Sequence, residues 1–121
     1  KKYKYAEFFN RYKRAIEASL GQILSADIYK NIHMVNQENV VALCSIDRQG
    51  YIEFRQMLIG SKRQPYFNYI AEKSLDYAGS VGEVPEGLFQ YRTQERILMP
   101  VEISFIGKPK FVWIYSIPEY K

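Results

Sequence analysis

Hydrophobic residues recur at every third or fourth position in two segments of the chain, and this spacing is typical of amphipathic helices. The first segment covers residues 3–24 and predicts an N-terminal helix. Its apolar stripe consists of Tyr5, Phe8, Phe9, Tyr12, Ile16, Leu20 and Ile23. The second segment begins at Pro65, a residue suited to a first helical turn, and ends before Gly79, a common helix stop. It predicts a helix over 65–78 that buries Phe67, Ile70, Ala71, Ser74, Leu75 and Ala78.

Between and after these helices the hydrophobic period changes to that of strands. Residues 40–46 form an apolar run, and residues 51–59 alternate, with Ile52, Phe54 and Leu58 expected on one face. The segment Asp47-Arg48-Gln49-Gly50 separates them and predicts a turn, opened by Asp and closed by a Gly with positive φ. A hairpin is therefore expected over 40–59. Two further strands are predicted within 96–117, one at 96–106 and one at 111–117, whereas 25–38 and 79–95 are expected to be connections.

The element order is helix, strand, strand, helix, strand, strand, which predicts an α+β fold. We expect an antiparallel sheet of three to four strands in the order 2-1-3-4. The amphipathic helix 65–78 would pack on this sheet, with the helix 1–24 as an additional N-terminal element. The chain has 121 residues, of which 47% are hydrophobic. Such a length and composition suit one domain with one core, so residues 1–121 are treated as a single domain.

The charge of the chain is concentrated at its start. The net charge is +4, and residues 1–14 carry Lys1, Lys2, Lys4, Arg11, Lys13 and Arg14 against Glu7, a balance of +5 that leaves −1 for the remainder. A basic segment can contact nucleic acid or anionic lipid, but a folded body that is not basic argues against a dedicated nucleic-acid domain. Because the chain begins abruptly, we expect it to be a fragment or mature form of a longer protein.

Few residues in the sequence are suited to catalysis. His33 is the one histidine, and a metal site needs three or four ligands. Cys44 is the one cysteine and lies within an apolar strand, where a buried, inert thiol is the usual state. The segment Gly79-Ser80-Val81-Gly82 lacks the Lys-Ser/Thr that completes a phosphate-binding loop. The sequence therefore predicts a protein that is not an enzyme and has no cofactor or metal.

The segment from Val40 to Phe105 carries a recognisable pattern. A strand with an Asp-x-x-Gly turn (41–50) is followed by a second strand that ends in small polar residues (52–61). An amphipathic helix (66–78), a Pro-containing loop with Val84-Pro85-Glu86-Gly87 and the returning strand Met99-Pro100-Val101-Glu102-Ile103-Ser104-Phe105 complete the pattern. In this order it resembles the C-terminal periplasmic domain of the TonB/TolA family of energy transducers. The resemblance covers more than half of the chain, and it leaves open the choice between the TonB and TolA branches.

The resemblance implies a protein–protein interaction domain of the cell envelope that takes part in energy transduction for transport. Such a domain would be periplasmic, as the C-terminal part of an inner-membrane-anchored protein whose anchor lies upstream. Its partner would be an outer-membrane receptor or a periplasmic or outer-membrane lipoprotein. An extended peptide can add to an exposed sheet edge by backbone hydrogen bonds, with alternate side chains giving specificity.

The partner-binding edge is expected on the last strands. The residues predicted to form it are Ile97, Met99, Val101, Phe111, Val112, Trp113 and Tyr115. Two alternatives remain open. The same residues could serve core and edge packing, or the last strand could form a homodimer by edge pairing. A cytoplasmic binding domain, with nucleic acid as a possible ligand, is the alternative function, although nucleic acid is the less favoured partner.

Overall fold

The structure is a computed structural model. It describes residues 5–25, 38–62, 65–105 and 112–115, the last range as backbone only. The helices are α1 (Ala6–Leu24) and α2 (Pro65–Asp76), with a short 3-10 helix η2 (Glu86–Leu88). The strands are β1 (Glu38–Asp47), β2 (Ile52–Ile59), β3 (Arg96–Phe105) and β4 (Val112–Tyr115). The predicted α+β class is confirmed, and so is the predicted order of the two helices and the first three strands.

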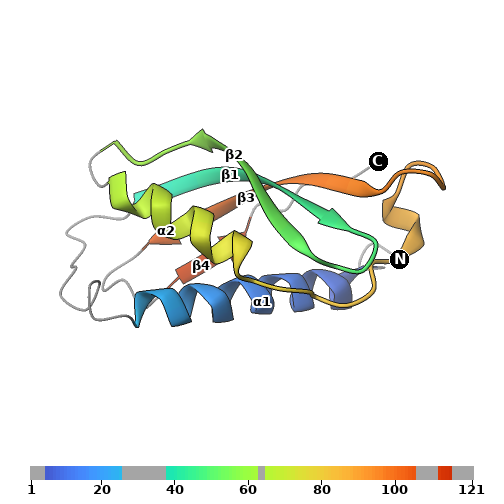
Figure 1. Cartoon of the computed structure of the whole chain (residues 1–121). Coiled ribbons are helices and arrows are strands. Elements are labelled where there is room, and N and C mark those ends of the chain that lie inside the picture. The colour runs from blue at the N-terminus through green and yellow to red at the C-terminus, as the bar shows by residue number, and fades with distance from the viewer. Residues whose placement is uncertain (1–4, 26–37, 63–64, 106–111, 116–121) are drawn as a thin grey trace.

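The strands form one antiparallel sheet in which β1 lies between β2 and β3, so the predicted order 2-1-3 is confirmed (Figure 1). The backbone of β4 pairs with the second half of β3, from Glu102↔Tyr115 to Phe105↔Val112. The β1–β3 pairing is continuous over ten residues, from Glu38↔Phe105 to Asp47↔Arg96. This ten-residue pairing forms the centre of the sheet.

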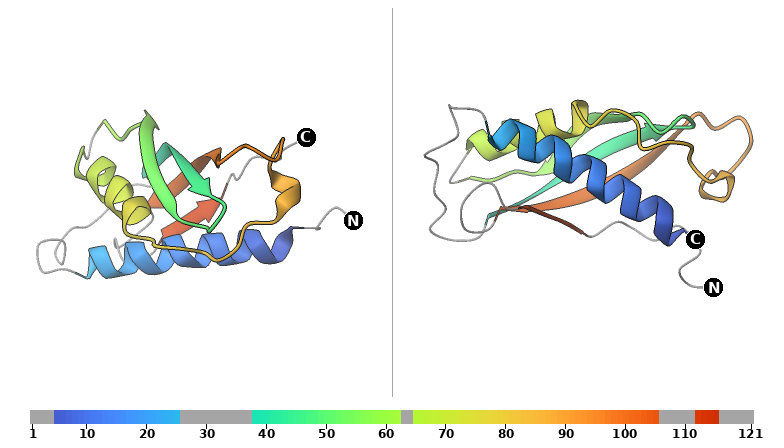
Figure 2. Two further views of the ribbon diagram at one scale, coloured as in Figure 1. Left: turned by 45° about the vertical axis from the view of Figure 1, so that its right-hand side comes forward. Right: turned by 90° about the horizontal axis from the view of Figure 1, so that it is seen from below.

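Both helices lie on one face of the sheet and contact each other (Figure 2). The core lies between this helical layer and the sheet. It takes every second residue of the central strands, as the period of a strand requires. The strands contribute Val40, Ala42, Cys44 and Ile46 from β1 and Ile97, Met99, Val101, Ile103 and Phe105 from β3. The helices contribute Phe8, Tyr12, Ile16, Leu20, Phe67, Ile70, Ala71 and Leu75.

The hairpin turn forms as the sequence predicts. The Asp47 carboxylate accepts hydrogen bonds from the backbone N–H groups of Gln49 and Tyr51, at 3.0 and 2.9 Å. Gly50 has a φ of +90°, a conformation that other residues rarely adopt. The turn is therefore stabilised by hydrogen bonds to one of its own side chains.

One predicted facing is wrong. Leu58 was expected beside Ile52 and Phe54 on the buried face of β2, but its side chain is 45% exposed and Met57 packs against the core instead. The β1–β2 register shifts between Val41 and Ala42 and again between Leu43 and Cys44. Each shift is a bulge that inserts one extra residue into β2, so the alternation of faces is broken between Phe54 and Leu58.

Candidate functional site

The structure places three of the predicted edge residues in the core. Ile97, Met99 and Val101 lie on the helical face of β3 and are 3%, 1% and 0% exposed. Their side chains are therefore not available to a partner, and a role for this stretch of β3 in binding would have to use its backbone. Pro100, between them, has no N–H to donate to a neighbouring strand. The partner-binding role of the stretch stays a prediction.

The other predicted edge residues belong to the end of the chain. Val112, Trp113 and Tyr115 lie in β4, where the register pairs Val112 with Phe105, Trp113 with Ser104 and Tyr115 with Glu102. Phe111 lies outside the described residues. In the order β2-β1-β3-β4, β4 is the strand at one end of the sheet. The predicted residues of β4 pair with residues 102–105 of β3, and the structure describes no pairing between β4 and Ile97, Met99 or Val101.

The opposite edge of the sheet, at β2, is occupied by the chain itself. Three backbone N–H groups along or just beyond this edge donate to acceptors from α2 and the segment after it. The N–H of Ile52 donates to the Gly79 carbonyl at 3.3 Å. The N–H of Phe54 donates to Oδ1 of Asp76 at 2.9 Å, and that of Ser61 donates to Oδ1 of Asn68 at 2.7 Å.

These contacts follow from the direction of α2, which runs back along β2 after the loop at residue 60. Asn68, in the first half of α2, reaches the residues just after β2, and Asp76, its last residue, reaches the start of β2. Between these two positions β2 carries its two bulges, which bend an edge strand and prevent regular pairing. The β2 edge is therefore a poor template for an added strand.

The hairpin tip is closed off by the segment 79–84, which follows α2. Val81 N–H donates to the Gly50 carbonyl at 2.9 Å, and the Ser80 hydroxyl donates to the Gln49 carbonyl at 2.7 Å. From the other side, the Arg11 guanidinium of α1 donates to the carbonyls of Val81 and Glu83. The segment 79–84 is thus held between α1 and the hairpin.

Arg48, in the hairpin turn, fixes the next part of the same connection. Its guanidinium donates to the carbonyls of Gln94, Tyr91 and Arg92 at 2.9, 3.2 and 3.0 Å. It also pairs with the Glu86 carboxylate at 2.5 Å and lies 3.9 Å from the centre of the Phe89 ring. One arginine therefore organises a loop that sequence analysis treated only as a connection. The partners lie 38 to 46 residues away, so no local pattern indicates them.

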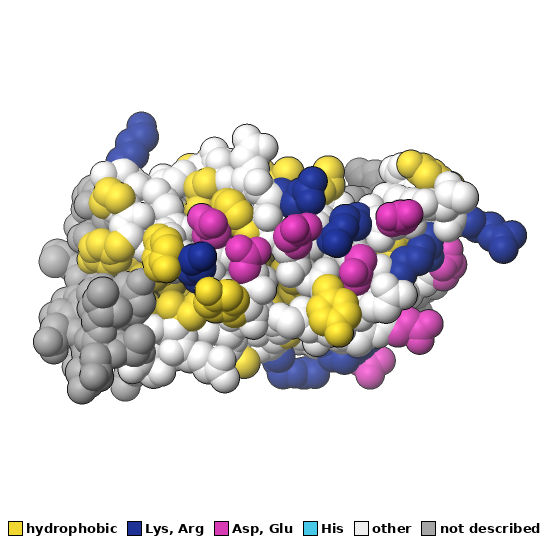
Figure 3. Space-filling view, viewed as in Figure 1, with side chains coloured by type: hydrophobic (Ala, Val, Ile, Leu, Met, Phe, Trp, Pro, Cys, Tyr) yellow, Lys and Arg dark blue, Asp and Glu magenta, His cyan; other side chains and the backbone are white. Residues whose placement is uncertain are grey.

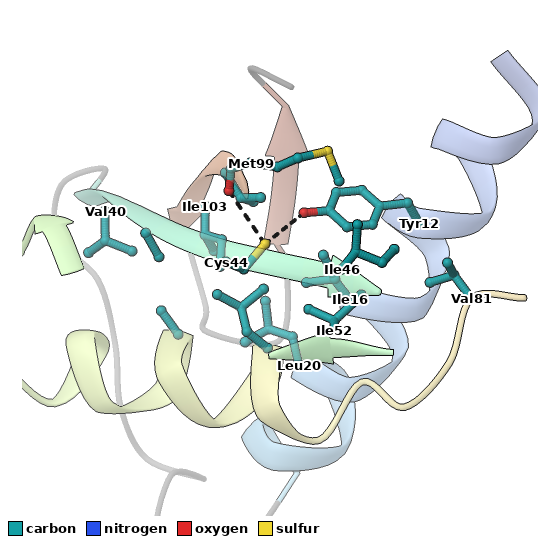
Figure 4. Packing of buried hydrophobic residues seen from close by; sticks show 14 of the residues in the cluster. Tyr12, Ile16, Leu20, Val40, Cys44, Ile46, Ile52, Val81, Met99 and Ile103 are labelled. Atoms are coloured by element: carbon teal, nitrogen blue, oxygen red, sulfur yellow. Dashed lines mark hydrogen bonds between the residues drawn. The ribbon is translucent and has the colours of Figure 1, made fainter. Parts of the chain in front are cut away.

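The thiol of Cys44 lies in the centre of the core, where the Tyr12 hydroxyl is 2.9 Å from Sγ and the Met99 carbonyl is 3.4 Å away (Figure 4). Burial raises the pKa of the Cys44 thiol to about 11, against a smaller lowering by the Tyr12 hydrogen bond. The thiol is therefore protonated at neutral pH, and the thiolate needed for nucleophilic attack or metal binding is not formed. His33 lies outside the described residues, and the described side chains contain no cluster of three or more potential metal ligands.

Charges of both signs are interspersed on the face seen in Figure 3. The described residues visible there form no continuous basic patch of the kind that follows a phosphate backbone. No helix within the described ranges has the length and hydrophobicity to cross a membrane. In comparisons with known proteins, the chain matches no family model, no curated protein and no solved structure.

The capping of β2 leads to a prediction about Asp76. Asp76→Ala removes the acceptor for the Phe54 N–H and leaves an unpaired donor at the edge of a strand, so the variant is expected to self-associate more than the parent. Asp76→Asn keeps an Oδ1 acceptor and is the matched control. Sedimentation velocity over a range of protein concentrations measures the difference. Equal behaviour of the Ala and Asn variants would mean that this cap does not protect the edge.

Proposed function

We propose that the chain is a non-catalytic protein–protein interaction domain that binds an extended segment of its partner at the β4 side of the sheet. The observation that carries this proposal is the difference between the two edges. The β2 edge is capped by Gly79, Asp76 and Asn68, so an added strand would have to displace the chain's own acceptors. At the other end of the sheet, no described strand pairs with the outer side of β4.

Strand addition suits this end of the sheet on physical grounds. The β4 strand has only four residues and pairs with the second half of β3. A guest strand would therefore add to the outer side of a short strand, and it would not have to displace a long existing pairing. Backbone hydrogen bonds would supply the common part of the affinity, and alternate side chains would select the guest. The buried side chains of Ile97, Met99 and Val101 would support the sheet from below without touching the guest.

The resemblance of residues 40–105 to the TonB/TolA family supplies the biological part of the proposal. On the basis of this resemblance, we propose that the domain is the periplasmic C-terminal end of an inner-membrane-anchored energy transducer of the cell envelope. The guest would be a segment of an outer-membrane receptor or of a periplasmic or outer-membrane lipoprotein. The order of the elements over residues 40–105 agrees with the pattern on which the resemblance rests, and this agreement supports the proposal.

The binding edge can be located with a photo-crosslinking residue at position 113. We expect it to capture an envelope protein through one extended segment, identified by mass spectrometry of the crosslinked peptide. The matched control carries the probe at Tyr77, which is 65% exposed and follows Asp76, the residue that binds the start of β2 at the opposite edge of the sheet. Equal capture at both positions would show that the partner contacts the domain with no preference for the β4 edge. Recovery of cytosolic or RNA-associated proteins would favour the alternative function.

Prolines at neighbouring positions of β4 test the backbone mechanism with the captured segment as a synthetic peptide. Successive N–H groups of an antiparallel strand point to opposite sides, so Trp113→Pro and Ile114→Pro delete one donor toward β3 and one away from it. We expect one variant to lose stability, and the other to keep its stability but to bind the peptide at least tenfold more weakly. Unchanged peptide binding in both folded variants would contradict strand addition at β4.

A further inference from the structure

The face of the sheet opposite the helices is not covered by any described helix. The residues of β3 on this face are Arg96, Leu98, Pro100, Glu102 and Ser104, because the alternate residues 97, 99, 101, 103 and 105 are in the core. Ser104 is itself buried, and the four residues that are not buried begin with a basic residue, end with an acidic residue and have two apolar residues between them. We call this surface, together with its neighbours on β1 and β2, the open face.

The centre of the open face is apolar. The register places Leu43 beside Pro100, and Leu98 is 52% exposed. Val41 and Leu43 are half-buried, and Ile59 at the β2 side is 61% exposed. Large apolar side chains that are exposed next to one another, with charges at the margin, are typical of surfaces that meet another protein.

The charged ends are held in position by neighbouring side chains. Nη1 of Arg96 lies 3.1 Å from the Ser45 hydroxyl and 3.5 Å from the Glu53 carboxylate. The Glu102 carboxylate accepts a hydrogen bond from the side-chain amide of Asn39 at 3.1 Å. The Arg96 side chain remains 42% exposed, so its guanidinium can still bind a second carboxylate. The two charges are six positions apart, or about 20 Å at a rise of about 3.3 Å per residue.

From this arrangement we infer that the open face binds the open face of a second copy of the chain. A two-fold axis between Leu98 and Pro100 would place Arg96 of each copy opposite Glu102 of the other. The same axis would stack Leu98 of one copy on Pro100 of the other. Two sheets pack face to face at about 10 Å, a gap that the side chains of Arg and Glu can span together. In such an isologous dimer each favourable contact occurs twice.

The dimer is expected to be weak. Three strands at a spacing of about 4.8 Å and about seven residues of length give a face of roughly 15 by 20 Å. This is smaller than the approximately 800 Å² per partner of stable complexes. Dissociation in the micromolar range or above is therefore expected, with weaker association at high salt because the charge pairs lie at the margin. This dimer uses the face of the sheet and leaves the outer edge of β4 to the guest strand.

Sedimentation equilibrium of the full chain from about 10 µM to about 1 mM tests the inference, because this range brackets the affinity expected for a small interface. The parent is expected to be monomeric at the low end and substantially dimeric at the high end. Leu98→Lys should abolish the dimer with little change in Tm, since Leu98 is already exposed. Tyr77→Lys, on the helical side, is the matched control and should leave the dimer unchanged. A parent that stays monomeric to about 1 mM would overturn the inference.

Charge reversal tests the two-fold geometry itself. Arg96→Glu and Glu102→Arg, each alone, should weaken the dimer about tenfold or more, because each creates two like-charge contacts. The double variant Arg96→Glu/Glu102→Arg restores opposite charges across the axis and should recover most of the affinity. Failure of the double variant to recover would overturn the proposed axis. A dimer that survives Leu98→Lys but is lost in a β4 proline variant would be an edge dimer and would overturn the open-face dimer.

Discussion

Replacement of Gly50 by Ala is expected to lower the free energy of unfolding by about 3 kcal/mol or more. Two separate costs combine at this position. The φ of Gly50 is +90°, which an L residue with a side chain rarely adopts. A Cβ at position 50 would also collide with the carbonyl oxygen of Gly82 and would lie 2.8 Å from its nitrogen. Both contacts are to backbone, so the segment 79–84 would have to move away from the hairpin tip.

Two other glycines separate these costs. Gly79 has a φ of +75° with nothing within 4 Å of an added Cβ, so Gly79→Ala should show the backbone cost alone, about 1–2 kcal/mol. Gly21 lies within α1 in open space, so Gly21→Ala should be neutral or stabilising by up to about 1 kcal/mol. Denaturant unfolding of the three variants gives the comparison. A cost for Gly50→Ala no larger than that for Gly79→Ala would contradict close packing between the hairpin tip and the segment 79–84.

The contact at Gly50 also bears on the proposed function. The segment that packs on the hairpin tip continues directly from Asp76 and Gly79, the two residues that cap the start of β2. A hairpin tip pushed away by a side chain at position 50 would therefore loosen the same edge that the caps protect. We expect Gly50→Ala to expose the start of β2 as well as to destabilise the domain.

Local patterns predict the parts of this fold in which neighbours in sequence decide the outcome. Five of the predicted interior positions of the second helix, Phe67, Ile70, Ala71, Ser74 and Leu75, are buried in α2, whereas Ala78 lies beyond the helix, which ends at Asp76, and is only partly buried. The Asp47 turn is confirmed because its hydrogen bonds span only two and four residues. The strand order 2-1-3 could also be predicted, because a hairpin followed by a crossing helix allows few simple positions for the next strand.

Long-range polar contacts could not be predicted in the same way. Asp76 binds a backbone group 22 residues away, and the partners of Arg48 are more distant still. One signal was present in the sequence. Asp76 stands at the C-terminal end of a helix, where the helix dipole disfavours an acidic side chain, and such a conflict indicates a role outside the helix. The bulges of β2 left no such signal, so the facing of Leu58 was predicted wrongly.

The predicted binding edge shows a limit of alternation as a guide to function. Apolar residues at positions 97, 99 and 101 mark one face of a strand, but alternation does not indicate whether that face meets the core or a partner. In the structure it meets the helices. The residues of the opposite face, including Leu98 and Arg96, were not predicted to form an interaction surface, because that row contains both charged and apolar residues.

Replacement of Phe67 by Ala is expected to lower the free energy of unfolding by about 3–5 kcal/mol, and to affect the β4 side of the sheet most. Phe67 of α2 is fully buried, and its ring stacks on Phe105 with 4.4 Å between the centroids. Phe105 is the last residue of β3 and pairs with Val112 of β4. The cavity left by the ring would therefore open directly beneath the point at which β4 joins the sheet.

Hydrogen–deuterium exchange can show which strands lose protection in this variant. In Phe67→Ala, the amides of Val112–Tyr115 should lose protection more than those of Ile52–Ile59, beyond the change caused by lower global stability. Leu75→Ala is the matched control. It removes another fully buried side chain from the same helix at a similar cost of about 2–5 kcal/mol, but Leu75 lies toward the end of α2 near Asp76 and the start of β2.

The two variants should consequently differ in function at comparable stability. Under conditions in which both remain folded, Phe67→Ala should weaken capture of an extended segment at β4, whereas Leu75→Ala should retain it. The reason is mechanical: a guest strand can add only to a strand that is itself held in the sheet, and the Phe67–Phe105 stack supports the end of β3 to which β4 is attached. Equal loss of capture in both variants would mean that binding follows global stability rather than the support of this edge.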